Sequence, residues 1–317
     1  MKKDIYDLII IGAGPGGITA GIYAGRQRMK TLILTKDFGG QMTKKATEVC
    51  NYPGFKRVSG RELINRFVEH LKAQEIEIKF KEVSKIKKNK DIFSVITEKK
   101  EIFYSFSVII ATGADPRPLE IPGEKEFIGK GVSYCVTCDG PLFRNKKTAV
   151  IGGGNAGFEA ALFLAHYAKE IYILEFGPEV KADKENQEEV YKSKKIKVIT
   201  NAKAKEIKGN GFVQKLIYED LKEKKTKELK IDGIFVEIGS QPATSMAKGL
   251  VDFNKRDEIK VEFETYQTKT PGLFAVGDVN TGRFKQIVTA AGEGCKAALA
   301  AYNYLYNLKK QKTGDDN

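Results

Sequence analysis

Hydrophobic residues in the first part of the chain occur as short runs separated by polar and glycine-rich stretches. A continuous apolar run at 8–11 predicts a buried parallel strand, which leads through a glycine loop and a helical stretch to a second strand at 30–35. Later segments alternate apolar and polar residues, as half-buried strands do, at 75–80, 92–97 and 102–107. This half of the pattern closes on the apolar run that begins the segment 108–113.

The same order occurs a second time, which indicates an internal duplication. A strand at 148–151 leads through another glycine loop to a helix at 158–167 and a strand at 171–176. Alternating segments around 213–218 and 229–231 follow, and this half closes on 233–239. The two glycine loops begin at Gly12 and Gly152, 140 positions apart. Each half is therefore predicted to be a βαβ unit with an inserted antiparallel layer.

A third block at 272–308 begins with a short strand and ends in an alanine-rich helix. Its place after the second repeat predicts that it returns to complete the first domain, and the polar residues from Lys309 onward predict a frayed tail. The predicted fold class is α/β, with two Rossmann-like dinucleotide-binding domains of three ββα layers, the second inserted in the first. The predicted domains are 1–113 with 245–317, and 114–244.

Composition supports a globular protein of about two domains. The chain has 317 residues, 41% hydrophobic and 30% charged, which excludes disordered and fibrous classes. No apolar run is long enough for a membrane span, and the N-terminus does not resemble a signal peptide, so a cytoplasmic location is predicted. The formal charge is +13, but lysines are interleaved with glutamates and no aromatic-basic motif accompanies them. We expect no nucleic-acid binding and a basic surface that favours acidic protein partners.

Both glycine loops fit the fingerprint of a dinucleotide site. Gly12, Gly14 and Gly17 stand between a predicted strand and a predicted helix, and Gly152, Gly154 and Gly157 occupy the equivalent place in the second repeat. The first glycine of each loop permits a tight turn, the second lets the backbone approach a pyrophosphate, and the third lets helix and strand pack closely. Structural glycine turns are the alternative, but two matches in a repeat favour two dinucleotide sites.

The two predicted sites differ at the end of their second strand. Thr35 and Lys36 follow that strand in the first repeat, whereas Glu175 stands 18 residues beyond Gly157 in the second. An acid at this place accepts the ribose 2′-hydroxyl of NAD and repels the 2′-phosphate of NADP by about 1–4 kcal/mol. No arginine cluster follows to compensate. The alternative is that Glu175 only caps a strand end in solvent.

Two of the four cysteines form a Cys-x-x-Cys pair. Cys135 and Cys138 can close a reducible disulfide, and Asp139 directly after them can exchange a proton during thiol chemistry. Half of a zinc site is the alternative, but the sequence holds no second cysteine pair, and its two histidines, His70 and His166, stand alone. We therefore predict no metal. The other two thiols, Cys50 and Cys295, are expected to be buried and inert.

Over essentially its whole length the sequence resembles the low-molecular-weight thioredoxin reductase family. The matching segments are GAGPGG at 12–17, FGGQM at 38–42, NYPG at 51–54, ATGA at 111–114, YCVTCDG at 134–140, GGGNAG at 152–157, FAVGDV at 274–279 and FKQIVTAAGEG at 284–294. The resemblance implies FAD in the first domain and a nicotinamide cofactor in the second, which also carries the cysteine pair. It further implies a homodimer and a rotation between the domains about hinges near 113–114 and 240–245.

The resemblance also implies a mechanism and a set of site residues. Hydride passes from the nicotinamide to FAD, the flavin reduces the Cys135–Cys138 disulfide through Cys138, Cys135 attacks the partner's disulfide, and Asp139 acts as the acid. The implied FAD residues are Gly12, Gly14, Pro15, Gly17, Thr35, Gly40, Gln41, Asn51, Val83, Thr112, Gly113, Gly277, Asp278, Lys285, Gln286 and Ile287. The implied nicotinamide-dinucleotide residues are Gly152, Gly154, Asn155, Ala156, Gly157, Glu175 and Gly239.

One segment departs from the NADPH-using members of that family. They carry a His-Arg-Arg motif where this chain has Leu174-Glu175-Phe176, and the segments 138–143 and 174–183 look more like the NADH-using flavoprotein of alkyl hydroperoxide reductase. That flavoprotein has an N-terminal thioredoxin-like extension, whereas the first strand here begins by Tyr6. A separate small thiol carrier is therefore expected.

The predicted function is a thioredoxin-disulfide reductase that uses NADH, with NADPH as the alternative donor, and reduces a thioredoxin- or glutaredoxin-like protein. The alternatives are a reductase of a peroxiredoxin system, a ferredoxin-dependent relative and a non-catalytic flavin redox sensor. The intact glycine loop at 152–157 opposes the ferredoxin-dependent reading, and the intact Cys-x-x-Cys-Asp segment opposes the sensor.

Overall fold

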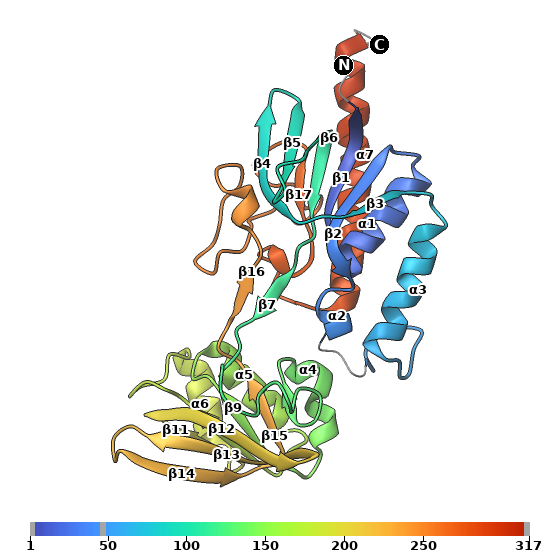
Figure 1. Cartoon of the computed structure of the whole chain (residues 1–317). Coiled ribbons are helices and arrows are strands. Elements are labelled where there is room, and N and C mark those ends of the chain that lie inside the picture. The colour runs from blue at the N-terminus through green and yellow to red at the C-terminus, as the bar shows by residue number, and fades with distance from the viewer. Residues whose placement is uncertain (1–3, 45–48, 314–317) are drawn as a thin grey trace. The chain divides into compact units, whose positions relative to one another are not determined.

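The computed structural model describes residues 4–44 and 49–313, and the chain divides into two compact units (Figure 1). The first unit takes in Met1–Asp115 and Gln241–Asn317, and the second is Pro116–Ser240. The chain thus crosses between the units at 115/116 and 240/241, where the sequence had predicted boundaries at 113/114 and 244/245. The crossing segments β7 (Ala114–Pro116) and β16 (Ser240–Pro242) pair with each other.

A sheet in the order β3-β2-β1-β6-β5-β4 forms the centre of the first unit, and β17 also pairs with β6. The parallel strands are β1 (Ile5–Ala13), β2 (Thr31–Phe38), β3 (Glu77–Phe80), β6 (Ile102–Ile110) and β17 (Leu273–Ala275). The antiparallel extension is β4 (Val83–Asn89) and β5 (Ile92–Thr97). The third block of the sequence therefore joins the first unit through β17.

Helices cover one face of this sheet, and its antiparallel extension together with residues 246–259 covers the other (Figure 1). The helices are α1 (Pro15–Arg26), α2 (Gln41–Lys44), α3 (Gly60–Lys72) and α7 (Ile287–Thr313), and α1 packs closely against α7. Ile10 of β1 is fully buried toward these helices. Ile9 and Ile11 are buried toward β5 and the short helix η2 (Ser245–Ala247). Because both faces are covered, the central strands are continuously apolar rather than alternating.

The second unit repeats this arrangement. Its parallel sheet has the order β11-β10-β9-β15-β8. These strands are β8 (Val132–Ser133), β9 (Lys147–Ile151), β10 (Glu170–Leu174), β11 (Ile196–Ile199) and β15 (Gly233–Val236). One face packs on α5 (Asn155–Leu164) and α6 (Lys184–Lys192). The other packs on an antiparallel layer, β12 (Ala202–Asn210), β13 (Phe212–Asp220) and β14 (Lys225–Lys230). Two three-layer, Rossmann-like units confirm the predicted fold class.

Three details of the first unit differ from the prediction. The alternating segment at 75–80 was expected in an antiparallel layer, but β3 pairs parallel with β2. The segments at 102–107 and 108–113 were treated as separate, but residues 102–110 form the single strand β6. The frayed tail predicted from Lys309 is wrong for 309–313, because α7 stays helical to Thr313, and the rest of this tail lies outside the described residues.

None of the helices in the described ranges is both long and apolar enough to cross a membrane.

Candidate active site

The first glycine loop is shaped by backbone contacts that leave no room for side chains. Gly12 has a φ of +101°, and a Cβ at this position would lie 2.4 Å from the Ala111 carbonyl oxygen. A Cβ at Gly17 would lie 2.0 Å from the Gly12 carbonyl oxygen. At Gly14, which precedes α1, no side chain caps the helix and a Cβ would meet open space. Bare amide groups at a helix start, with room in front of them, suit a pyrophosphate.

The strand order brings distant residues of the predicted FAD site to one edge of the sheet. Because β1, β6 and β17 run parallel and in register, the residues after each strand meet at their carboxyl ends. Asn51 donates a hydrogen bond of 3.1 Å to Gln286, although the two residues are 235 positions apart. Gln41 donates to the Ala114 carbonyl, and Thr112 donates to the Ala243 carbonyl at 2.7 Å.

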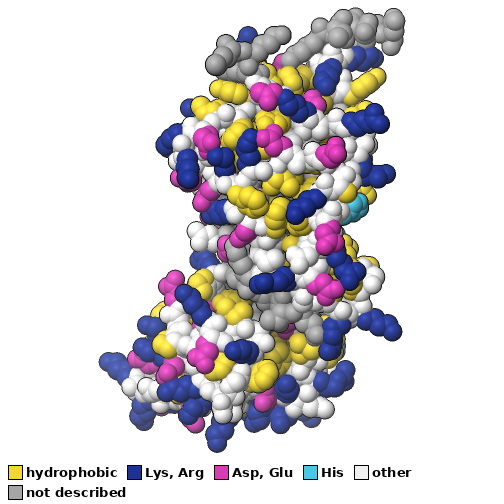
Figure 2. Space-filling model, turned by 45° about the vertical axis from the view of Figure 1, so that its right-hand side comes forward, with side chains coloured by type: hydrophobic (Ala, Val, Ile, Leu, Met, Phe, Trp, Pro, Cys, Tyr) yellow, Lys and Arg dark blue, Asp and Glu magenta, His cyan; other side chains and the backbone are white. Residues whose placement is uncertain are grey.

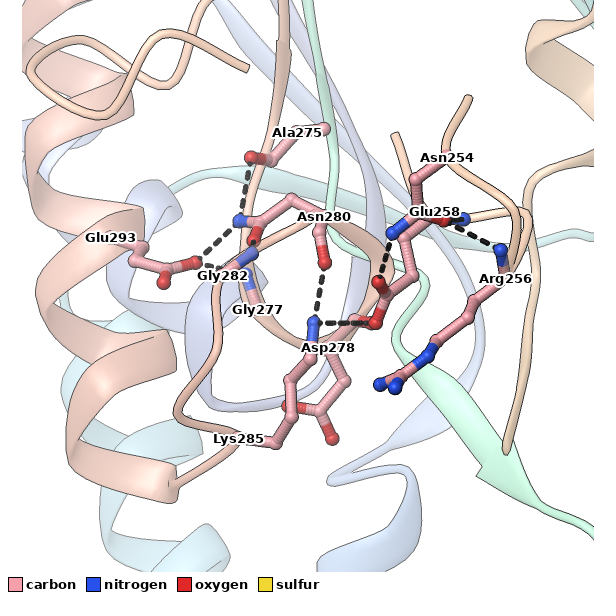
Figure 3. A network of polar contacts seen from close by, with 10 residues as sticks. All are labelled: Asn254, Arg256, Glu258, Ala275, Gly277, Asp278, Asn280, Gly282, Lys285 and Glu293. Atoms are coloured by element: carbon pink, nitrogen blue, oxygen red, sulfur yellow. Dashed lines mark hydrogen bonds and ion pairs between the residues drawn. The ribbon is translucent and has the colours of Figure 1, made fainter. Parts of the chain in front are cut away.

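A polar network holds the loop that follows β17 (Figure 3). Glu293 on α7 accepts hydrogen bonds from the backbone amide of Gly277, at 2.6 Å, and from Asn280, at 2.7 Å. The Lys285 ammonium lies 3.2 Å from a Glu258 oxygen and donates to the Asp278 carbonyl at 3.3 Å. Glu258, Asn280 and Glu293 were not predicted as site residues. The available signal was Glu293, an acid inside a stretch of small residues, whereas Glu258 lies in a charged stretch and does not stand out.

The Asp278 carboxylate, in contrast, takes no part in this network. The side chain is half-buried on the short helix η3 (Gly277–Val279), and among the described residues no group donates a hydrogen bond to it (Figure 3). Burial raises the pKa of Asp278, and the nearby Lys285 ammonium opposes that shift. A desolvated acceptor beside a glycine loop fits a hydroxyl-bearing ligand such as FAD, because a ligand hydroxyl would supply the missing donor.

Replacing Asp278 with alanine is expected to weaken FAD binding about tenfold to a hundredfold. A hydrogen bond to a charged acceptor contributes about 1.5–3 kcal/mol, which corresponds to that range. The measurement is titration of apoprotein with FAD, followed by quenching of flavin fluorescence. The Asp278→Asn variant keeps one carbonyl oxygen, and its affinity for FAD should lie between those of wild type and the alanine variant. If the Asp278→Ala variant bound FAD within twofold of the wild-type affinity, Asp278 would not hold the flavin.

Other members of the predicted FAD set have internal roles. The Thr35 hydroxyl donates to the Asp37 carbonyl at 2.6 Å. The Val83 side chain is buried in the core beneath the sheet, so only its backbone could meet a ligand. Ile287 begins α7 and packs beside Val49 and Leu63. Pro15 is the first residue of α1, and positive φ angles mark the remaining turn positions at Gly40, Gly113 and Gly277.

The second glycine loop repeats the geometry of the first. A Cβ at Gly152 would lie 2.4 Å from the Glu237 carbonyl oxygen, and one at Gly157 would lie 1.9 Å from the Gly152 carbonyl oxygen. Gly154 precedes α5 without a side-chain cap. Asn155 and Asp183 bind each other through two hydrogen bonds of 2.6 Å, which fix the segment beside the loop. Ala156 continues α5, and Gly239, with a φ of +96°, follows β15.

Glu175 is held within the second loop rather than extended into solvent. One carboxylate oxygen accepts from the Gly153 amide at 2.7 Å, and the other accepts from the Gly177 amide at 2.8 Å. The side chain is half-buried directly after β10. These two hydrogen bonds are not expected for a side chain that only caps a strand end in solvent. They fix a carboxylate at the loop where a dinucleotide ribose would bind.

Glu237 is an unpredicted acid at the same edge. It follows β15 and stands opposite Gly152, the place that Ala111 takes in the first repeat. The carboxyl group forms no hydrogen bond or ion pair with any described residue, and burial raises the pKa of Glu237 to about 7. Aligning the run 233–239 with 107–113 would have revealed this exchange of alanine for glutamate.

Cys135 and Cys138 are joined as a disulfide on the short helix α4 (Val136–Asp139). Both sulfur-bearing residues are half-buried, and Asp139 ends the helix. Among the described residues no cluster of three histidine, cysteine or acidic side chains could hold a metal ion. The expectation for Cys50 is wrong, since this thiol is exposed, and Cys295 is half-buried rather than fully buried.

A buried acid fixes the segment that enters this helix. Glu124 is only 1% exposed and accepts hydrogen bonds from the Tyr134 hydroxyl, at 2.6 Å, and from the backbone amides of Leu119 and Glu120. Burial and the Glu124 carboxylate raise the pKa of Tyr134. Because Tyr134 directly precedes Cys135, Glu124 ties the redox pair to the fold. Sequence reasoning missed this role.

Two dinucleotide-type folds and a disulfide in one of them define a dinucleotide-linked disulfide oxidoreductase. Residues 6–294 match the family model described as pyridine nucleotide-disulphide oxidoreductase, and the chain belongs to this family. Its structure is similar to that of a thioredoxin reductase, and members of this family use FAD and a pyridine nucleotide.

Individual relatives agree with this assignment. The chain is 39% identical over 303 residues to an NADH dehydrogenase of Bacillus subtilis, covering 96% of this chain and 59% of the relative. It is 39% identical over 308 residues to an alkyl hydroperoxide reductase component of Pseudomonas aeruginosa, with the same coverage of 96% and 59%. The crystal structure of thioredoxin reductase from Streptococcus pyogenes matches with a TM-score of 0.91 and 35% identity, covering 96% of this chain and 99% of that one.

The chain thus spans about three fifths of the length of the two relatives compared by sequence. The site residues named above, the homodimer and the choice of partner stay predictions.

Proposed function

We propose that this protein reduces a protein disulfide with electrons from NADH, through FAD and the Cys135–Cys138 pair. The observation that carries the proposal is the disulfide itself, because it lies in a unit with a dinucleotide loop and beside the end of its parallel sheet. A structural disulfide in such a fold would need no Cys-x-x-Cys spacing and no half-exposed sulfur.

The chain's own groups would divide the work as follows. The amides at Gly14 and Gly154 bind the two pyrophosphates, Asp278 accepts a hydroxyl of FAD, and Glu175 accepts the ribose hydroxyls of the nicotinamide dinucleotide. When bound, FAD supplies a group that takes hydride from the nicotinamide and gives an electron pair to the disulfide. Cys138 receives that pair, Cys135 attacks the partner's disulfide, and Asp139 provides the proton for the departing thiolate.

The choice of NADH rests on Glu175. Its carboxylate is fixed by the Gly153 and Gly177 amides and cannot turn away from an incoming 2′-phosphate without losing both bonds. Like charges at about 4 Å repel by roughly 1–4 kcal/mol, which favours NADH over NADPH about fivefold to a thousandfold. The similarity to a protein named NADH dehydrogenase supports the same donor.

The proposed partner is a small thioredoxin- or glutaredoxin-like protein. The structural match to thioredoxin reductase supports it, and the match to the alkyl hydroperoxide reductase component supports a carrier that serves a peroxiredoxin as the second candidate. Lys and Arg side chains are spread over the visible face, with fewer acidic ones between them (Figure 2). With a formal charge of +13, this surface favours an acidic carrier and would make its reduction sensitive to salt.

Anaerobic stopped-flow experiments test the proposal. The holoenzyme is mixed with NADH, NADPH or reduced ferredoxin, and flavin absorbance is followed before and after addition of oxidised thioredoxin. We expect rapid bleaching by NADH, slower bleaching by NADPH at the same concentration, and return of the flavin absorbance with thioredoxin. Faster bleaching by ferredoxin would favour the ferredoxin-dependent alternative. Bleaching that no protein disulfide reverses would favour the redox sensor.

A further inference from the structure

The Thr137 hydroxyl lies against one sulfur of the disulfide. Thr137 Oγ1 is 3.5 Å from Cys135 Sγ, which is within hydrogen-bonding distance for a sulfur acceptor. Cys135 is bonded to Cys138 and has no thiol hydrogen, so between these two atoms only the hydroxyl can donate. The residue is exposed and stands between the two cysteines on α4.

We propose that Thr137 is a catalytic residue of this reductase, whose hydroxyl donates a hydrogen bond to Cys135 Sγ and stabilises the thiolate that forms there. This inference rests on the proposed function and adds a further residue to the same site. A thiolate is a much stronger hydrogen-bond acceptor than a disulfide sulfur, so the contact strengthens when the pair is reduced.

The hydroxyl acts at two points of the thiol–disulfide exchange. Two-electron reduction of the Cys135–Cys138 bond, which bound FAD would supply, releases Cys135 as a thiolate that Thr137 stabilises. The Cys135 thiolate then forms a bond to one partner sulfur, the partner's S–S bond breaks, and its other sulfur leaves as a thiolate and takes up a proton. Cys138 next attacks Cys135, which restores the internal disulfide and releases the partner as a dithiol.

The other hydrogen bonds that Cys135 forms with described residues involve its backbone. Ser133 Oγ accepts from the Cys135 amide at 3.1 Å and donates to the Cys135 carbonyl at 3.4 Å, so it fixes the chain without touching the sulfur in these bonds. The elements packed on α4 are α5 and η1 (Gly140–Phe143). Their charged residues, together with those of α4, are Asp139 and Glu159, and neither changes in the variants below.

The test measures how fast Cys135 is alkylated at different pH values. In a Cys138→Ser background Cys135 is a free thiol, and the holoenzyme carrying Thr137, Thr137→Val or Thr137→Ser is treated with iodoacetamide between about pH 5 and 10. Modification is followed by mass spectrometry of the peptide that contains Cys135, because Cys50 is exposed and also reacts. Valine has the shape of threonine without the hydroxyl, and serine keeps the hydroxyl.

Thr137→Val is expected to raise the apparent pKa of Cys135 by about one unit. Thiolate reactivity rises with thiol pKa with a slope of about 0.4–0.5, so alkylation should become about threefold slower at low pH and about threefold faster at high pH. The Thr137→Ser profile should follow the parent. A variant that only disturbed the local structure would change the alkylation rate in the same direction at low and at high pH.

Two results would overturn the inference. The first is an alkylation profile of Thr137→Val that superimposes on that of the parent protein. The second is a profile of Thr137→Ser that matches that of Thr137→Val. Failure of the proposed function is recognised separately. If wild-type holoenzyme did not reduce thioredoxin with NADH but valine still shifted the alkylation profile, the reductase assignment would be wrong and the bond to Cys135 would stand.

Discussion

Replacing Cys138 with serine is expected to abolish protein-disulfide reduction, by on the order of a thousandfold or more, while flavin reduction by NADH continues. A serine hydroxyl cannot form the disulfide that accepts the electron pair, and it cannot release Cys135 from a mixed disulfide with the partner. The dinucleotide groups of the second loop are unchanged, so the first half-reaction has no reason to slow.

Reductive titration provides the sharpest measurement. The flavin and the disulfide each accept one electron pair, so wild type should consume about twice as much reductant per chain as the Cys138→Ser variant. Cys295→Ser is the matched control, because it removes a thiol from α7 that lies outside the pair. Equal uptake by wild type and Cys138→Ser, or retained thioredoxin reduction by that variant, would exclude Cys135–Cys138 as the electron relay.

The local sequence was sufficient to predict those parts of the site whose function depends on the backbone alone. The glycine loops could be predicted because there is no room for a Cβ at Gly12, Gly17, Gly152 and Gly157. Only glycine therefore fits these positions without a shift of the backbone. The central strands could be predicted because burial on both faces requires continuous apolar runs. The two repeats also reinforce each other, which a single motif cannot do.

Pairing partners, in contrast, are not encoded in an alternating pattern. The segment at 75–80 alternates because β3 is a sheet edge with half-buried side chains, and a parallel edge strand gives the same pattern as an antiparallel one. Strand β6 changes from alternating to continuous apolar residues along its length. Its first half pairs with β5 and its second half lies between β1 and β17.

Polar side chains of the site were the hardest to predict, because their roles depend on residues distant in sequence. Glu293 binds the amide of Gly277, and Glu124 binds Tyr134 and the amides of the 119–120 segment. Glu237 follows β15 at the carboxyl ends of the parallel strands and forms no hydrogen bond or ion pair with any described residue. Glu124 and Glu237 belong to none of the matching segments, and Glu293 lies in the segment 284–294, which assigned it no role. Only the fold shows whether such an acid accepts hydrogen bonds, pairs with a base or is left without a partner.

The two repeats differ in the residue after the apolar part of their second strand, Thr35 in the first repeat and Glu175 in the second, and the sequence already indicated this difference. It leads to the second prediction with a large expected effect. Thr35 and Glu175 occupy equivalent positions in the two repeats, because Leu34 pairs with Ile11 as Leu174 pairs with Ile151. Thr35 turns its hydroxyl to the Asp37 carbonyl, whereas Glu175 accepts two amides and presents a negative charge. The first repeat thus shows which residue this backbone tolerates when the acid is absent.

Glu175→Thr, which copies the first repeat, is therefore expected to remove the preference for NADH. Wild type should favour NADH over NADPH about fivefold to a thousandfold in apparent affinity, from the repulsion of roughly 1–4 kcal/mol between Glu175 and a 2′-phosphate. In the variant NADH should bind about tenfold more weakly, because a charge-assisted hydrogen bond to the ribose is lost, and NADPH should bind more tightly. The ratio should approach one.

The measurement is the dependence of the flavin reduction rate on nucleotide concentration, which separates apparent affinity from the limiting rate. Glu175 is expected at the ribose and not at the nicotinamide, so the limiting rate with saturating NADH should stay within about twofold of wild type. A fall in both quantities with both nucleotides would mean that the threonine has disturbed the loop. In that case Glu175→Gln, which keeps the length and one acceptor oxygen but removes the charge, decides the question: if the preference for NADH persists without the charge, repulsion by Glu175 is not its cause.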